Sequence, residues 1–168
     1  MQAVELLYNV LTKDEEDYIY DLINDKSKWI WRTNYNQRTE GGGKLWYDSI
    51  LPDYDKLKNY HNFICDNEKY LVRETAINII QYGRQYKNSI HADSGDLSYA
   101  TYFNENFKGG ELVYFNENQE KFIIKPKKGL TLKINKGVFH SVEEVTEGVR
   151  FSLYTFLMRN PKNQKSLI

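Results

Sequence analysis

Short alternating segments in the second half of the chain constrain its fold more than any other feature of the sequence. From about residue 74 onward, eight segments rich in aromatic and β-branched side chains follow a period of two. They cover residues 75–82, 89–93, 97–104, 111–115, 121–126, 130–134, 140–145 and 149–157. Turn-forming sequences such as SGD, KGG, NEN and NKG separate them. Eight short strands punctuated in this way predict an antiparallel sandwich or jelly roll.

The N-terminal part of the chain follows a helical pattern instead. Residues 12–25 read TKDEEDYIYDLIND, in which Thr12 and Glu15 have the spacing of a capping box. A second helix is expected over residues 52–65, where apolar side chains recur at helical spacing. His61 falls in this second helix beside polar residues, and we expect it on the surface.

Length and composition bound the class of protein. A chain of 168 residues has the size of one domain. We therefore expect a single domain over residues 1–168, mainly β with N-terminal helices (α+β). In it a mainly helical support, residues 1–73, packs on one sheet of a jelly-roll core, residues 74–157. The 23 basic and 23 acidic residues cancel, which disfavours nucleic acid and anionic membranes as partners.

The cysteine count and the apolar runs bear on the compartment. Cys65 is the single cysteine, so the chain has no internal disulfide. The first residues lack a basic and then apolar signal segment, and no apolar run approaches the ~20 residues that span a bilayer. These features predict a soluble cytoplasmic protein, and the Asn-, Lys-, Ile- and Tyr-rich composition suggests a bacterial cell or a virus-infected host cell.

A glycine-rich segment lies between the two predicted helices. Residues 38–48 read RTEGGGKLWYD, and three successive glycines are costly to order, so we expect a mobile loop. One interpretation is a lid over the substrate, with Trp46 as part of it. The other is a surface connection between N-terminal elements.

The remaining two histidines suggest a metal site. In SIHAD, His91 and Asp93 are two residues apart, so on a strand their side chains point to the same face. His140 begins a later strand. Two histidines and one carboxylate with open positions are the ligand set of non-haem Fe(II) oxygenases. A His-x-Asp triplet also occurs by chance, so this pattern alone leaves a metal-free interpretation open.

Arg150 strengthens the metal interpretation. It lies ten residues after His140 in VRFSLYTFL, a segment that is largely apolar on both faces and therefore expected to be covered on both sides. A buried guanidinium needs an anion, and a dicarboxylate co-substrate could supply one. The alternative is a structural bridge to a glutamate.

The order of these residues resembles a known family. YGRQYKNSIHAD (82–93) is similar to a Tyr-Gly-x-Gly-x-x-Tyr-x-x-His-x-Asp run, and TYFNENFKGGELVYF (101–115) to a Tyr-Leu-Asn…Gly-Gly-Glu-Thr-x-Phe block. PKKGLTLKI and HSVEEVTEGVRFSLYTF resemble the strand–turn–His…Gly-x-Arg-x-Ser ending. These family patterns occur in the 2-oxoglutarate/Fe(II)-dependent dioxygenases, and the chain resembles specifically their prolyl 4-hydroxylase-like branch. Gln85 replaces a loop glycine, and Arg150 stands where collagen-type prolyl hydroxylases commonly have lysine.

The resemblance implies a fold and roles for particular residues. The fold is a double-stranded β-helix (jelly roll, cupin-like). The metal ligands are His91, Asp93 and His140. Arg150 binds the distal carboxylate of 2-oxoglutarate, and these four residues form the catalytic set. Three more residues are candidates for co-substrate binding by the same resemblance: Tyr82, Tyr102 and Ser152. Ser98 is a fourth candidate, because it lies on the same strand face as Tyr102 and could line the same pocket. For Tyr82, core packing is an equal alternative.

The resemblance also implies a reaction. Fe(II), 2-oxoglutarate and O2 take part, succinate and CO2 are released, and ascorbate is a possible additional cofactor. The favoured substrate is a prolyl residue in a peptide or protein, without membrane or nucleic-acid partners. Two alternatives remain: the same chemistry on a nucleobase or a free small molecule, or a non-catalytic β-barrel binding module that holds its metal for structure.

Overall fold

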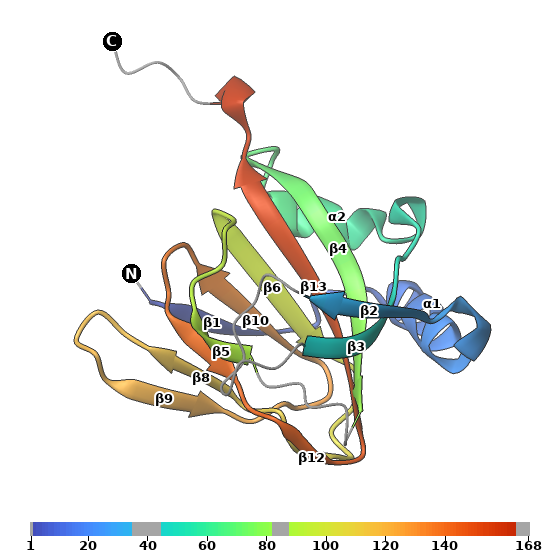
Figure 1. Cartoon of the computed structure of the whole chain (residues 1–168). Helices are drawn as coiled ribbons and strands as arrows, with labels where there is room; N and C mark the ends of the chain where they lie inside the picture. The colour runs from blue at the N-terminus through green and yellow to red at the C-terminus, as the bar shows by residue number, and fades with distance from the viewer. Residues whose placement is uncertain (1, 35–44, 82–87, 164–168) are drawn as a thin grey trace.

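The computed structural model describes residues 2–34, 45–81 and 88–163. Two antiparallel sheets form the body of the molecule (Figure 1). The larger sheet has seven strands, in the spatial order β1 (Val4–Tyr8), β10 (Leu130–Asn135), β6 (Leu97–Tyr102), β13 (Val149–Arg159), β4 (Tyr70–Gln81), β3 (Leu45–Ile50) and β2 (Ile30–Asn34).

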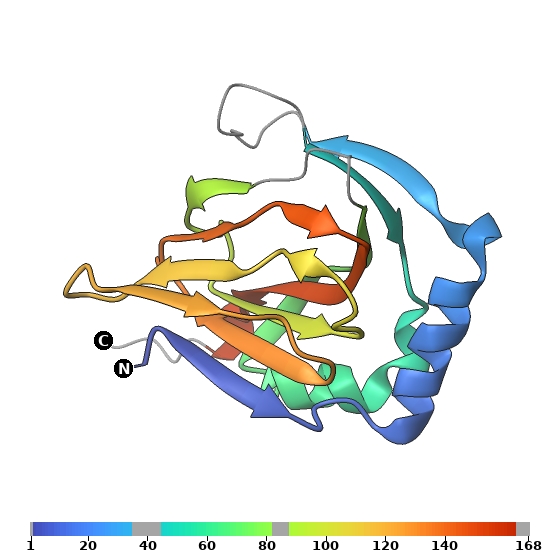
Figure 2. The same cartoon turned by 90° about the horizontal axis from the view of Figure 1, so that it is seen from below.

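The smaller sheet lies over one face of the larger one (Figure 2). Its four strands are, in order, β5 (Asn88–His91), β11 (His140–Val142), β8 (Leu112–Phe115) and β9 (Lys121–Ile124). A short pair, β12 (Val145–Glu147) and β7 (Lys108–Gly109), connects the layers at one end. All eight predicted segments contain strands, and segment 140–145 divides between β11 and β12. The predicted jelly roll is thereby confirmed.

The N-terminal part contains more sheet than its sequence pattern predicts. β1 pairs with β10, and the hairpin of β2 and β3 pairs with β4. The expectation of a mainly helical support is therefore wrong for these strands. Each is only five or six residues long, and its conformation depends on pairing with a strand distant in sequence. β3 also takes up the end of the predicted loop 38–48, from residue 45 on, while residues 38–44 and the lid hypothesis lie outside the described residues.

The two predicted helices are present and share one carboxylate. α1 (Lys13–Asn24) begins after Thr12, and the capping box of Thr12 and Glu15 is confirmed, with the Glu15 N–H donating to Thr12 Oγ1 at 3.3 Å. α2 (Lys58–Cys65) is shorter than predicted, because a 3₁₀ turn occupies Tyr54–Lys56. No side chain caps α2 at its own N-cap position, but Glu15 accepts a hydrogen bond from the Tyr60 N–H at 2.9 Å.

The helices cover the outer face of the larger sheet and form the main core with it (Figure 1). In the described residues no helix has the length and apolar character needed to cross a membrane. Tyr60 is fully buried, and its hydroxyl lies 2.9 Å from Thr155 Oγ1 on β13. The fully buried apolar residues of this layer include Ile19, Leu57, Ile64, Ile77, Ile79, Leu153 and Leu157.

His61 is more enclosed than expected. Its ring centroid lies 4.7 Å from that of Tyr54, and burial lowers the pKa of the imidazole. Its Nε2 is buried and has no hydrogen-bond partner among the described residues. The surface prediction is wrong because the preceding 3₁₀ turn folds Tyr54 against this face of α2.

The inner face of the larger sheet carries polar side chains toward the smaller sheet. β13 lies between β6 and β4, so alternate residues along it face the helices or the space between the sheets. Arg150 and Ser152 belong to the inner face, and both are buried. The expectation that this strand is covered on both sides is confirmed.

Candidate active site

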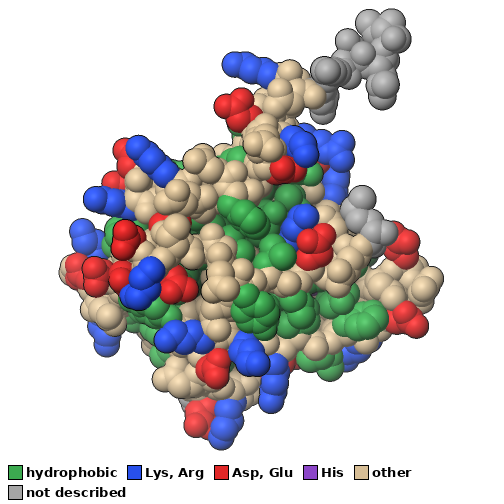
Figure 3. Space-filling view, turned by 180° about the vertical axis from the view of Figure 1, so that it is seen from behind, with side chains coloured by type: hydrophobic (Ala, Val, Ile, Leu, Met, Phe, Trp, Pro, Cys, Tyr) green, Lys and Arg blue, Asp and Glu red, His purple; other side chains and the backbone are tan. Residues whose placement is uncertain are grey.

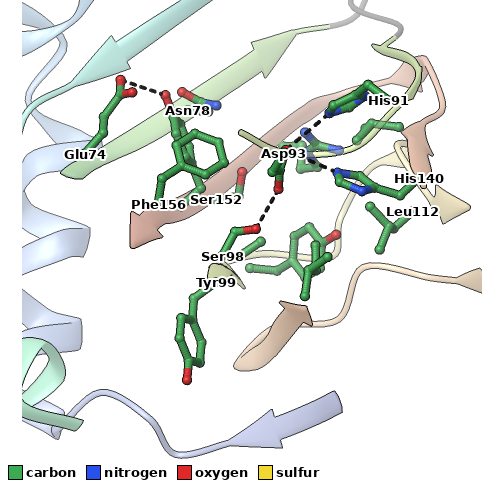
Figure 4. A pocket seen from close by; sticks show the side chains of 16 residues that line it. Glu74, Asn78, His91, Asp93, Ser98, Tyr99, Leu112, His140, Ser152 and Phe156 are labelled. Atoms are coloured by element: carbon green, nitrogen blue, oxygen red, sulfur yellow. Dashed lines mark hydrogen bonds and ion pairs between the residues drawn. The ribbon is translucent and has the colours of Figure 1, made fainter. Parts of the chain in front are cut away.

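His91, Asp93 and His140 converge between the two sheets (Figure 4). One ligand atom from each lies within 4.8 Å of the other two. Asp93 Oδ1 is 3.4 Å from His91 Nε2 and 3.5 Å from His140 Nε2. β5 and β11 bring the imidazoles together, because His91 and His140 are directly paired in the ladder. The sequence prediction that these three residues meet is confirmed.

Backbone carbonyls orient both imidazoles. His91 Nδ1 lies 2.7 Å from the Ser89 carbonyl oxygen, and His140 Nδ1 lies 2.9 Å from that of Val138. A carbonyl oxygen can only accept, so Nδ1 carries a proton in both rings and Nε2 faces Asp93. A protonated ring donates from Nε2 to the carboxylate, whereas a neutral ring presents its Nε2 lone pair there. This is the arrangement that metal-ligating histidines adopt.

The protonation of this group follows from burial and hydrogen bonding. Burial disfavours the charge of Asp93, but hydrogen bonds from His91 and Ser98 and the charge of His140 outweigh it, so the pKa of Asp93 is lowered. Burial lowers the pKa of His140. For His91 burial acts in the same direction, but the hydrogen bonds to Asp93 and Ser89 outweigh it and the pKa is raised.

Ser98 contacts the ligand group directly. Its hydroxyl donates to Asp93 Oδ2 at 2.6 Å, which leaves Oδ1 directed at the imidazoles. The sequence placed Ser98 on the cavity face of β6, and it does line the cavity. Its hydroxyl is engaged with the carboxylate, a contact that strand facing alone could not reveal.

Arg150 lies on the inner face of β13, 5 % exposed. Its Nη1 donates to the Gly110 carbonyl oxygen at 3.0 Å, and its guanidinium carbon lies 6.0 Å from the ring centroid of Tyr102. Burial raises the pKa of Tyr102 despite the nearby Arg150 charge, so its hydroxyl stays a neutral donor.

Asn104 holds the backbone on both sides of Arg150. Its Nδ2 donates to the Val149 carbonyl oxygen at 2.7 Å, and its Oδ1 accepts from the Phe151 N–H at 3.0 Å. Sequence reasoning did not assign Asn104 a role, although the residue belongs to the TYFN stretch that carries the family resemblance.

Two glycines shape the turn against Arg150. Gly109 and Gly110 have φ of +79° and +70°, which confirms that they serve the turn geometry. A Cβ on Gly109 would lie 2.0 Å from a backbone oxygen, and one on Gly110 would lie 3.3 Å from Arg150 Cδ and Nη1. This close approach goes beyond the turn geometry that the sequence predicted.

The three candidate ligands line one cavity together with Ser98, Tyr102 and Arg150. Its volume is about 190 Å³, far larger than the ~30 Å³ of one water molecule. Ser152 lines it in a row with Tyr102, directly opposite on β6. Tyr82, the remaining candidate, lies outside the described residues. The residues lining the cavity are Glu74, Asn78, His91, Asp93, Ser98, Tyr99, Ala100, Tyr102, Leu112, Ile134, His140, Val142, Arg150, Ser152, Tyr154 and Phe156.

The donor set fits the groups that the sequence implies. Two imidazole nitrogens and one carboxylate oxygen suit Fe(II) and leave coordination positions open. A buried guanidinium and a phenol hydroxyl in the same cavity suit a carboxylate of a small anion. The fold and the site together fit the class of non-haem Fe(II) oxygenases.

Comparison with known proteins shows what the chain is similar to. Residues 77–158 match the family model of the 2OG-Fe(II) oxygenase superfamily. The matched region runs from β4 to β13 and includes the three converging ligands and Arg150. No curated protein matches the chain.

Solved structures share the fold over nearly the whole chain. An oxidoreductase of the 2OG-Fe(II) oxygenase family from Burkholderia pseudomallei is 17% identical with a TM-score of 0.74, covering 94% of this chain and 86% of that one. A Pseudomonas putida prolyl-4-hydroxylase is 14% identical with a TM-score of 0.72, covering 95% and 94%. A prolyl hydroxylase solved with a hypoxia-inducible-factor peptide, from Trichoplax adhaerens, is 12% identical with a TM-score of 0.66, covering 94% and 84%.

Proposed function

We propose that the protein is an Fe(II)- and 2-oxoglutarate-dependent dioxygenase that hydroxylates prolyl residues in a peptide or protein. The observation that carries the proposal is that an open three-ligand group and a buried arginine share one cavity. A structural metal site is usually closed by a fourth protein ligand. The described residues offer only three here, which favours catalysis over a binding module with a structural metal.

In this proposal His91, Asp93 and His140 would hold the iron, and Ser98 keeps the Asp93 carboxylate in place. Bound Fe(II) and 2-oxoglutarate supply the oxidising chemistry, with O2 consumed and succinate and CO2 released. Arg150 and Tyr102 bind the distal carboxylate of the co-substrate by charge-assisted hydrogen bonds. Ser152 lines the same part of the cavity and assists Arg150. The enclosing sheets keep bulk water from the reacting atoms.

The prolyl substrate is supported by the structural neighbours that are described as prolyl hydroxylases. The zero net charge supports a protein rather than a nucleic-acid substrate. On the face shown in Figure 3, basic and acidic side chains of the described residues are interspersed instead of forming a basic stripe. The chain as a whole carries no net charge.

Succinate release tests the proposal. Purified protein with Fe(II) and 2-oxoglutarate is incubated with proline peptides, oligonucleotides or free amino acids, and succinate and the oxidised product are measured by mass spectrometry. We expect proline peptides to stimulate succinate release and to gain one oxygen atom. Stimulation by oligonucleotides or free amino acids alone would overturn the prolyl assignment. Repeating the assay without ascorbate tests the ascorbate prediction.

A further inference from the structure

Asn78 has a buried hydrogen-bond acceptor at the wall of the cavity. The proposed cofactors do not donate a hydrogen bond to this acceptor. Asn78 is 9% exposed, lines the cavity from β4, and its Oδ1 has no hydrogen-bond partner among the described residues. In Figure 4 its side chain lies between those of Glu74 and Asp93. A buried acceptor without a donor is destabilising. This acceptor therefore points to a donor on a bound molecule.

The co-substrate cannot be that donor. Ionised 2-oxoglutarate has two carboxylates and a keto oxygen, which all accept hydrogen bonds. A substrate with N–H or O–H groups can donate to Asn78 Oδ1.

An internal partner for Asn78 is the competing explanation. Ser49, on β3, is directly opposite Asn78 in the ladder, is fully buried, and its Oγ also has no hydrogen-bond partner among the described residues. Side chains of paired residues lie on the same face of a sheet, so a rotation could bring this hydroxyl to Asn78. A Ser49 variant separates the two explanations.

Glu74 adds a negative charge to the same wall. It lies four residues before Asn78 and lines the cavity with it. Across the sheet, Glu74 pairs with Phe156 on β13, and Phe156 pairs with Ser98 on β6. Glu74 is therefore two strand spacings, or about 10 Å, from Ser98. Ser98 contacts Asp93, so Glu74 faces the space beside the metal ligands.

The charges of the loaded site cancel without Glu74. The formal charges sum to zero when the positive charges of Fe(II) and Arg150 are added to the negative charges of Asp93 and doubly ionised 2-oxoglutarate. Glu74 accepts a hydrogen bond from the Tyr154 hydroxyl at 3.3 Å and makes no ion pair among the described residues. A partly buried carboxylate of this kind favours a cation on the molecule that approaches it.

We propose that Glu74 and Asn78 form the subsite that recognises the substrate, through a positive charge at Glu74 and an N–H donor at Asn78. The inference rests on the proposed function and narrows its substrate class to peptides in which a basic side chain neighbours the proline. Glu74 and Asn78 are about 13 Å apart along the strand, so an extended substrate contacts both.

A set of matched peptides separates charge from hydrogen bonding. In one proline peptide the neighbouring residue is arginine, citrulline or norleucine, first before and then after the proline. Citrulline keeps the N–H donors of arginine without its charge, and norleucine has neither. We expect the KM for the arginine peptide to be about tenfold below that for the norleucine peptide, as for one charged hydrogen bond, with citrulline between them.

Two variants assign the effects to residues. Glu74→Gln should bring the arginine and citrulline peptides to the same KM. Asn78→Leu should raise the KM for all three peptides about tenfold and leave the KM for 2-oxoglutarate unchanged. Fluorescence anisotropy of a labelled arginine peptide, with Mn(II) and 2-oxoglutarate bound, measures the same preferences without turnover. Glu117→Gln, on the exposed β8–β9 turn, is the matched control and should change neither.

Other results would contradict the proposed role of Asn78, the charged subsite or the prolyl function, and these three cases can be told apart. If Ser49→Ala raises the peptide KM as Asn78→Leu does, the two residues form an internal pair. An Asn78→Leu change confined to the KM for 2-oxoglutarate assigns Asn78 to the co-substrate. Equal KM values for the three peptides refute the charged subsite while prolyl hydroxylation stands. A different result is that no proline peptide reacts but free arginine stimulates succinate release more than free citrulline does. If Glu74→Gln then removes this preference for arginine, the prolyl function is refuted and the proposed subsite is supported. No preference in either assay overturns the subsite.

Discussion

The Ser98 hydroxyl donates to Asp93 Oδ2 at 2.6 Å, while Asp93 Oδ1 faces the two imidazoles. The two oxygens of the Asp93 carboxylate therefore have separate partners. Ser98, on β6, holds Asp93, which lies in the connection between β5 and β6. Ser98→Ala removes this support without removing a ligand. We expect it to weaken Fe(II) affinity about 10–100-fold, as loss of an outer-sphere partner commonly does. Metal titration under anaerobic conditions measures it, and Ser94→Ala, on an exposed serine in the same connection, should have no effect.

His91→Ala, Asp93→Ala and His140→Ala should each abolish succinate production and remove most Fe(II) affinity. The described cluster offers one ligand atom from each residue, so no spare ligand replaces a lost one. Anaerobic titration with Fe(II) and a succinate assay on each variant check the prediction. A variant that retained normal turnover would refute the assigned ligand set.

Arg150→Ala should raise the concentration of 2-oxoglutarate needed for half-maximal rate at least tenfold and leave Fe(II) affinity nearly unchanged. It removes a buried charge-assisted pair worth about 1.5–3 kcal/mol. The measurement is the KM for 2-oxoglutarate beside the metal affinity. Loss of metal affinity with an unchanged KM would show that Arg150 supports the ligands instead.

Gly110→Ala should impair 2-oxoglutarate binding by displacing Arg150. The added Cβ would crowd Arg150 Cδ and Nη1 at 3.3 Å in a residue with φ +70°. Gly129→Ala provides a matched control, because Gly129 has φ +82° and a Cβ there would meet nothing within 4 Å. Both variants should lose about 1 kcal/mol of folding stability from backbone strain. Only Gly110→Ala should also raise the KM for 2-oxoglutarate.

Glu15→Ala should cost about 2 kcal/mol or more in the free energy of unfolding, because one carboxylate serves α1 and α2. It leaves the buried Tyr60 N–H without its acceptor. Urea denaturation measures the loss. Asp14→Ala, an exposed neighbour in the same helical turn, should change stability by much less.

The sequence predicted the parts of this molecule that depend on local pattern. The eight core segments, the capping box at Thr12 and the shared face of His91 and Asp93 follow from periodicity or from short motifs. That His140 joins them is what the family resemblance implied. Strand β1 could not be predicted, because its partner β10 is more than a hundred residues away. The Glu15–Tyr60 bond and the role of Asn104 likewise depend on tertiary contacts.

The order of strands in the larger sheet separates two tasks. Arg150 and Tyr102 lie on β13 and β6, whereas Glu74 and Asn78 lie on β4. Under the two proposals, substitutions on the inner face of β4 alter substrate range while the residues proposed to bind the co-substrate stay in place. An engineer seeking a new specificity would randomise positions 74 and 78 and leave β13 untouched, since its outer face also packs against the helices. Such a division allows a lineage to acquire new substrates without passing through an inactive ancestor.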